Sequence, residues 1–126
     1  MLVVADSSPL IVLVNIGHIE LLPQLFAQVA IPPQVSAELG QPSRPASVRQ
    51  FIASPPSWLL VRAPMTIEAI PMLHDGELAA ISLFRELNAD LLLIDEVRGR
   101  QAAADRHIRF TGTIGVLELA AGHGLL

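Results

Sequence analysis

Two aspartates in this sequence each stand directly after a short apolar run. Leu2–Ala5 leads into Asp6, and Leu91–Ile94 leads into Asp95. Apolar runs of this length without alternation are typical of strands buried on both faces, as in a parallel sheet. The carboxyl ends of such strands form the edge at which open α/β sheets bind ligands. An ionised carboxylate is costly there unless something positive lies beside it, so we expect both aspartates to face a ligand-binding edge.

Two glutamates are candidates for the same edge because of their positions on expected helices. Glu38 lies beside Val35 and Leu39 and shares the inward face of a short helix. Glu77 lies three residues before Ala80, at the head of the core-facing stripe of a longer helix. The pattern leaves two alternatives open, which are an exposed position for Glu38 and a favourable placement of Glu77 near the positive end of its helix.

The four acids together suit a hard cation: Asp6, Glu38, Glu77 and Asp95. Mg²⁺ and Mn²⁺ take oxygen ligands in octahedral geometry and usually keep several waters. Such a site can bind a phosphodiester, lower the pKa of a bound water and offset charge on the leaving oxygen. For Asp6 the alternative is a local turn with the amides that follow it, and for Asp95 it is a helix-start acid. The acids therefore predict a metal site with hydrolytic chemistry.

Four further residues are expected to support this site: Ser7, Glu96, Arg98 and Thr111. Ser7 would orient the preceding aspartate, and Glu96 could act beside its neighbour. Arg98 could contact a substrate phosphate, while Thr111 lies near the expected mouth of the sheet. Arg100 follows Glu96 by one helical turn, and we expect these two to pair on a solvated helix face.

The composition excludes several kinds of chemistry. Cys is absent, so the chain has no disulfide, thiolate zinc site or cysteine nucleophile. All eight basic residues are Arg, and without Lys there is no Walker phosphate loop and no Schiff base. A net charge of −4 argues against strong non-specific binding of nucleic acid, although bound divalent cations would change that balance.

The length of the chain and its high share of hydrophobic residues indicate its domain number, its location and its assembly. The chain has 126 residues, of which 52% are hydrophobic, and this suits a single domain over residues 1–126 with a large core. No apolar run approaches the ~18 residues that a membrane span needs, so we expect no membrane association and a cytoplasmic location. The same balance favours self-association, and a homodimer is expected.

The elements that would position the acids alternate between strands and helices. Strands are expected at Leu2–Ala5, Gln28–Ile31, Trp58–Val61, Leu91–Ile94 and Ile108–Phe110. Helices are expected at Ser8–Ile16, Ile19–Phe26, Gln34–Leu39, Ala46–Ala53, Asp75–Asn88, Glu96–His107 and Thr113–Ala121. Ser8 is expected to cap the first helix and Asp75 the longest one. The alternation predicts an α/β fold, a three-layer α/β/α sandwich with a mainly parallel sheet of four to five strands.

Six sequence blocks, in their order and spacing, carry a family resemblance. They are D-S-S-P-L-I at Asp6–Ile11, L-L-P-Q-L-F at Leu21–Phe26, I-P-P-Q-V-S-A-E-L at Ile31–Leu39, D-G-E-L-A-A-I at Asp75–Ile81, L-L-L-I-D-E-V-R-G-R at Leu91–Arg100 and T-G-T-I-G-V-L at Thr111–Leu117. With these blocks the chain resembles PIN-domain nucleases, in particular the small prokaryotic branch related to VapC-type toxins. The last two blocks are similar to those of the DUF3368 branch.

The resemblance implies a ribonuclease that uses Mg²⁺ or Mn²⁺ and has RNA as its substrate. The family's four acid positions would be held by Asp6, Glu38, Glu77 and Asp95. The chain has Glu77 where many toxins carry aspartate, with Asp75 nearby. It also has Val97 where many carry an acid two residues after Asp95, and Glu96 could substitute there.

Two functions are therefore expected as alternatives. The first is a metal-dependent endoribonuclease that serves as the toxin of a toxin–antitoxin pair. In that case a small antitoxin protein would insert a peptide across the site. The second is a PIN-fold module that binds nucleic acid or protein and has weak or no catalytic activity.

Overall fold

The computed structural model describes residues 1–126 and contains one five-stranded sheet. The strands are β1 (Leu2–Ala5), β2 (Gln28–Ile31), β3 (Leu59–Val61), β4 (Leu91–Leu93) and β5 (Phe110–Thr111). Their order in the sheet is β3-β2-β1-β4-β5, and every neighbouring pair is parallel. The expected parallel sheet is confirmed, with β1 at its centre.

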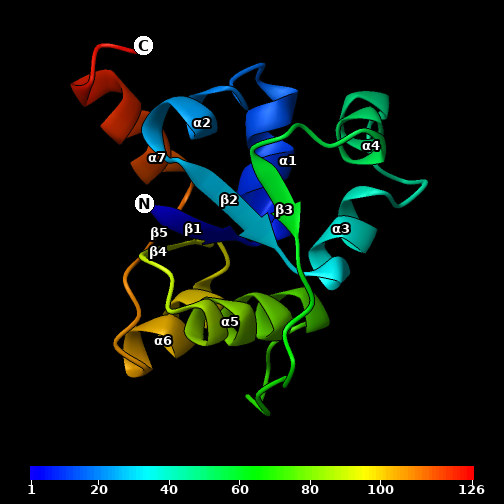
Figure 1. Ribbon diagram of the computed structural model, residues 1–126, viewed down its shortest axis with the longest axis vertical. Coiled ribbons are helices and arrows are strands. Elements are labelled where there is room, and N and C mark those ends of the chain that lie inside the picture. The colour runs from blue at the N-terminus through cyan, green and yellow to red at the C-terminus, as the bar shows by residue number, and fades with distance from the viewer.

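Helices cover both faces of this sheet (Figure 1). They are α1 (Ser7–Asn15), α2 (Leu21–Leu25), α3 (Pro33–Leu39), α4 (Ala46–Ala53), α5 (Asp75–Leu87), α6 (Val97–Asp105) and α7 (Thr113–Gly122). Successive residues of a strand face opposite sides. Val3 and Ala5 pack with residues of α1, α2, α3, α4 and α7, whereas Val4 packs with α5 and α6. The two core layers confirm the three-layer sandwich.

The strand order reverses direction between β1 and β4. The chain first builds β2 and β3 on one side of β1, then crosses over and builds β4 and β5 on the other. Crossovers between parallel strands are right-handed. Because strands are added first on one side of β1 and then on the other, α1 to α4 and α5 to α6 lie on opposite faces of the sheet. The connections leaving β1 and β4 therefore diverge, which opens a crevice at the carboxyl ends of these strands. Asp6 and Asp95 are the residues that lead into it.

The junction between β1 and α1 is tighter than the sequence predicts. Asp6, and not Ser8, occupies the N-cap position of α1, and Pro9 lies at the third helical position. Proline is tolerated there because the first helical N–H groups have no intrahelical partner. The backbone N–H of Asp6 still donates to the carbonyl of Leu93 at 2.9 Å. Sheet hydrogen bonding thus runs up to the helix without a loop, which fixes the position of the aspartate.

Other element boundaries also differ from those expected. His74, and not Asp75, is the N-cap of α5, because the carboxylate of Glu77 accepts the backbone N–H of His74 and so starts the helix one residue earlier. Helix α2 ends at Leu25, since Phe26 has an extended backbone that leads into β2. No helix in the structure has the length and apolarity needed to cross a bilayer.

Candidate active site

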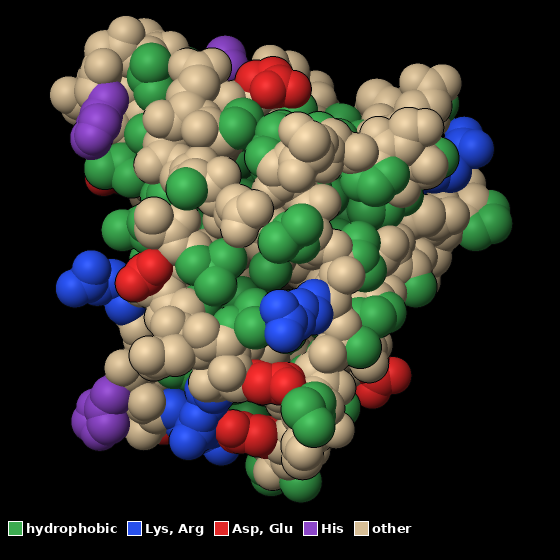
Figure 2. All heavy atoms as spheres, in the orientation of Figure 1, with side chains coloured by type: hydrophobic (Ala, Val, Ile, Leu, Met, Phe, Trp, Pro, Cys, Tyr) green, Lys and Arg blue, Asp and Glu red, His purple; other side chains and the backbone are tan.

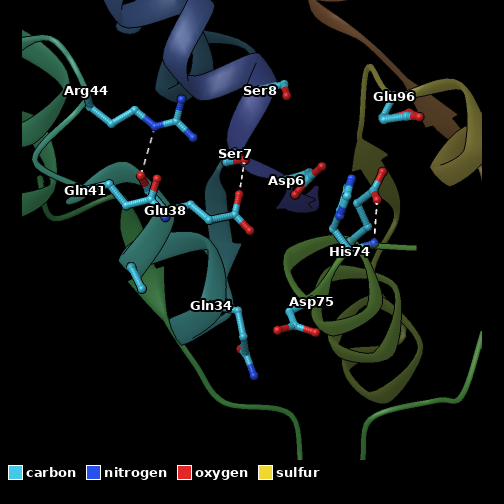
Figure 3. Close-up of a pocket in the computed structure, with 12 residues that line it drawn as sticks. Asp6, Ser7, Ser8, Gln34, Glu38, Gln41, Arg44, His74, Asp75 and Glu96 are labelled. Atoms are coloured by element: carbon cyan, nitrogen blue, oxygen red, sulfur yellow. Dashed lines mark hydrogen bonds between the residues drawn. The ribbon is translucent and has the colours of Figure 1, made fainter. Parts of the chain in front are cut away.

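An open cavity of about 610 Å³ lies at the carboxyl ends of the central strands (Figure 3). Its walls are the beginning of α1, helix α3 with the connection after it, the beginning of α5 and the residue before α6. Five lining residues are acids: Asp6, Glu38, Asp75, Glu77 and Glu96. Carboxylates from four separate segments therefore face one space, an arrangement that favours binding of a cation.

Asp6 lies at the base of this cavity and is only 3% exposed. Its Oδ1 atom has no hydrogen-bond partner. Burial raises the pKa of Asp6 to about 7, the backbone N–H of Ser7 acts against the increase, and the negative charges of Glu38, Glu77 and Asp95 add to it. Three of the acids predicted from the sequence are therefore close enough to Asp6 to raise the pKa of its carboxyl.

The raised pKa of Asp6 gives an expected pH dependence of stability. Its carboxyl has an ordinary pKa of 3.8 and a pKa of about 7 in the folded protein, so between these values the folded state binds more protons than the unfolded state. Stability then falls as pH rises, and we expect the free energy of unfolding to be about 2 kcal/mol lower at pH 8 than at pH 5. Urea unfolding with EDTA at both pH values measures this. A stability that rises toward pH 8 would contradict it.

Glu38 is held between α1 and α5. The hydroxyl of Ser7 donates to its Oε2 atom at 2.5 Å. On the opposite side the first turn of α5 approaches so closely that a Cβ atom at Gly76 would overlap Oε1 of Glu38. Only glycine allows this approach without displacing the carboxylate. Ser7 therefore orients Glu38 through its hydroxyl. The orientation of Asp6 by Ser7 stays a prediction.

Glu77 is the most enclosed of the glutamates, with 4% of its surface exposed. Its Oε1 atom accepts the backbone N–H of His74 at 2.9 Å, while its Oε2 atom is buried without a partner. A Cβ atom at Gly99 of α6 would lie 3.0 Å from that Oε2 atom. The inward orientation predicted from helix phase is confirmed, and one oxygen is left without a partner beside Gly99 of α6.

Asp95 takes a different position from the other three predicted acids. It does not line the cavity. The backbone N–H and the hydroxyl of Thr113 donate to its two carboxylate oxygens at 2.7 and 2.6 Å, so Asp95 caps the beginning of α7. Arg100 lies 4.0 Å from Asp95 and donates to the carbonyl of Ile94. The expected pair between Arg100 and Glu96 is therefore wrong, because the guanidinium turns back toward β4 and the ring of Phe110.

Glu96 lies where the sequence predicts Asp95. It is the N-cap of α6, and its Oε1 atom accepts the backbone N–H of Arg98 at 3.5 Å. Its Oε2 atom is buried without a partner, and the residue lines the cavity (Figure 3). Of the two adjacent acids after β4, Glu96 thus contributes to the cavity, and Asp95 is engaged in the packing of α7.

Nearly the whole chain matches a known family. The family model of DUF3368, described as a PIN domain, matches residues 2–126. The chain belongs to the PIN-domain family. PIN domains are usually nucleases, and those nucleases generally use divalent metals. No curated protein matches the sequence.

The fold of this PIN domain is also found in a solved structure. A PilT N-terminus domain protein from the hyperthermophilic archaeon Sulfolobus solfataricus P2 is similar over 95% of this chain and 93% of that one. The TM-score is 0.66 and the sequence identity is 17%. The likeness supports the fold, and the closer relation to VapC-type toxins stays a prediction.

The carboxylate oxygens of this PIN domain are of the kind that a divalent cation binds, although they are not gathered around one point. Three carboxylate oxygens from three different segments are buried and have no hydrogen-bond partner, namely those of Asp6, Glu77 and Glu96. Unpaired buried oxygens of this kind are costly unless a cation or ordered water binds them. In the structure as it stands, no three acids are close enough to one another to hold a single ion directly. A bound ion would therefore draw the side chains inward or keep several waters, as Mg²⁺ commonly does.

The remaining predicted residues lie outside the cavity, and other residues take their place. Arg98 is exposed and lines a separate pocket beside Ile70 and Met72, and Thr111 at the end of β5 does not reach the acids. Sequence reasoning did not identify Gln34, Arg44 and His74, which do line the cavity. Gln34 precedes Glu38 by one helical turn, and this spacing could have revealed it.

Proposed function

We propose that this PIN domain is an endoribonuclease that depends on Mg²⁺ or Mn²⁺. The observation that carries the proposal is the group of buried, unpartnered oxygens of Asp6, Glu77 and Glu96 around one open cavity. The cavity is open to solvent and is lined mostly by polar and charged residues. An anionic substrate such as RNA would approach these acids only after a cation has offset their charge.

The chain's own residues would divide the work as follows. Asp6, Glu77 and Glu96 would hold the cation with Glu38, which the hydroxyl of Ser7 keeps in position. When bound, the cation supplies an activated water and offsets charge on the leaving oxygen. Asp6 must release its proton for binding, because its pKa is about 7 before the cation arrives. The buried base of the cavity keeps bulk water away from Asp6.

The test is cleavage of a mixed pool of RNA by the purified protein with Mn²⁺. We expect cleavage with Mn²⁺ and none with EDTA. The variant Glu77→Gln should lower the rate at least ~100-fold, because it removes a buried charge on which the cation depends. The matched control is Glu118→Gln, which removes one negative charge from an exposed position on α7. Equal rates for Glu77→Gln and wild type would refute the proposed site.

We further propose that the protein is the toxin of a toxin–antitoxin pair and forms a homodimer. The toxin role rests on the resemblance to VapC-type proteins, and a small antitoxin would cover the acids with a basic side chain. The dimer is supported by exposed hydrophobic side chains, including Leu60 and Val61 on the edge strand β3. Figure 2 shows further hydrophobic side chains across the face that carries β3. Sedimentation equilibrium of the purified chain measures the dimer.

A second candidate is a PIN-fold module that binds nucleic acid or protein without cleaving it. It is favoured by one observation, which is that no three acids lie close enough to hold one ion as the side chains stand. Absence of cleavage with Mg²⁺, Mn²⁺ and Co²⁺, together with retained binding of RNA, would favour this second function over the first.

A further inference from the structure

The acidic cavity contains one arginine whose charge is not paired with any of the acids. Arg44 lines the cavity, and His74 is the other basic residue that does so. The ion pairs of the structure involve Arg85, Arg100 and Arg106. Arg44 takes part in none of them, although five carboxylates line the same space. Its guanidinium therefore does not serve to neutralise the acid cluster.

Backbone contacts hold Arg44 in place instead. Its Nε atom donates to the backbone carbonyl of Glu38 at 3.1 Å. Its own backbone N–H donates to the carbonyl of Gln41, and its carbonyl accepts a hydrogen bond from Nε of Arg49, both at 3.0 Å. The two Nη groups have no hydrogen-bond partner among the contacts of the structure. The guanidinium is thus fixed at one end and free at the end that binds ligands.

The free end of Arg44 extends toward the beginning of α1. Figure 3 shows its guanidinium directed at the helix that starts with Ser7 and Ser8. Ser8 also lines the cavity and is half-buried, but Figure 3 draws its side chain on the other side of α1 from the guanidinium. Gln41 lies on the same wall as Arg44. Arg44 and Gln41 therefore share one wall of the cavity with Glu38, while the other acids lie at its base and on the wall formed by the beginning of α5 and the residue before α6.

We infer that Arg44 forms a phosphate subsite of the proposed ribonuclease. A guanidinium with two free Nη groups binds phosphate oxygens in a bidentate manner. The ligand is a backbone phosphate of single-stranded RNA next to the phosphate that lies over the acids. This inference rests on the proposed function. It adds the path of the RNA across the protein, which leads from the acids toward the connection between α3 and α4.

Binding of a fluorescent oligoribonucleotide in Ca²⁺, followed by anisotropy, tests the subsite without cleavage. Arg44→Ala should weaken binding roughly 10- to 100-fold, as expected for loss of a charge-assisted pair. The slope of log affinity against log salt should become shallower by ~0.7. Arg109→Ala is the matched control, since it removes the same charge from an exposed position at the amino end of β5 and should change neither value.

A modified RNA tests the contact itself. A neutral methylphosphonate placed next to the cleaved bond should raise KM for wild type with Mn²⁺ and should have no further effect on Arg44→Ala, because the partner of that phosphate is already gone. Affinity for Mn²⁺ should be the same in wild type and Arg44→Ala. If Arg44→Ala fails to fold, Arg44→Lys serves in its place and should weaken binding to a smaller extent.

The outcomes separate the two proposals. Cleavage by wild type with unchanged binding and KM in Arg44→Ala would overturn the subsite and leave the nuclease in place. Wild type that neither binds nor cleaves RNA would overturn the proposed function, and the subsite with it. Weaker binding in Arg44→Ala, combined with loss of sensitivity to the methylphosphonate, would establish the subsite.

Discussion

Replacing Asp6 with asparagine is expected to make the protein more stable and, at the same time, inactive. Asp6 is 3% exposed and its pKa is about 7, so at pH 8 an ionised carboxylate is buried among other acids. Removing that charge should raise the free energy of unfolding by about 2 kcal/mol at pH 8, less than the full effect of the shift because the asparagine amide still needs partners. Cleavage of RNA with Mn²⁺ should fall at least ~100-fold.

Two measurements on the same preparations check this. Urea unfolding with EDTA gives the stability, and RNA cleavage with Mn²⁺ gives the activity. Glu118→Gln provides the reference for loss of an exposed negative charge. If Asp6→Asn unfolds more easily than wild type at pH 8, the buried charge of Asp6 does not destabilise the folded protein. Cleavage at the wild-type rate would place the reaction elsewhere.

The second large effect concerns the two adjacent acids after β4. Glu96→Gln is expected to weaken binding of Mn²⁺ at least ~10-fold, since Glu96 has a buried, unpartnered oxygen in the cavity. Asp95→Asn removes the same charge one residue earlier and should weaken it less. Asp95→Ala should instead lower the free energy of unfolding by about 1–2 kcal/mol, because Thr113 loses its acceptor and α7 loses its cap.

Calorimetric titration with Mn²⁺ and urea unfolding distinguish these roles. Because Glu96→Gln and Asp95→Asn change the net charge equally, any difference between them reports position rather than overall electrostatics. If Asp95→Asn abolished binding of Mn²⁺ and Glu96→Gln did not, Asp95 would be the ligand that the sequence predicts, and its hydrogen bonds to Thr113 would have to break when the cation binds.

The layers of the fold could be predicted from the sequence because two-sided burial leaves a strong pattern. Runs such as Leu2–Ala5 and Leu91–Leu93 lack polar residues only because helices cover both faces of the sheet. The order of the strands could not be predicted in this way. Each short apolar run fits any position in a parallel sheet, and contacts between distant segments decide which position it takes.

The acids differ in how well the sequence locates them. Glu77 could be placed because a helix repeats its faces regularly, so its phase relative to Ala80 fixes its direction. The sequence could not show which of Asp95 and Glu96 faces the cavity. Both lie between a strand and a helix, where side-chain directions follow no regular period. A single change of backbone direction there sends one side chain to Thr113 and the other to the cavity.

Arg44 illustrates a further limit. It lies in the connection between α3 and α4, and nothing in its neighbours along the chain marks it as part of a site. Its position depends on its hydrogen bond to the carbonyl of Glu38 and on the hydrogen bond from Arg49 to its own carbonyl. Such contacts arise from the local path of the backbone, which turn residues indicate only coarsely.

The hydrogen bond from Asp6 to Leu93 has a consequence for how the protein is made. It belongs to the pairing of β1 with β4, and most of the chain lies between these two strands in the sequence. Closing a loop of this length is slow compared with forming a helix. On the ribosome, Asp6 emerges long before Glu77 and Glu96, and the acids stay dispersed until β4 inserts beside β1. The acid cluster therefore forms only after β4 has been synthesised and has paired with β1.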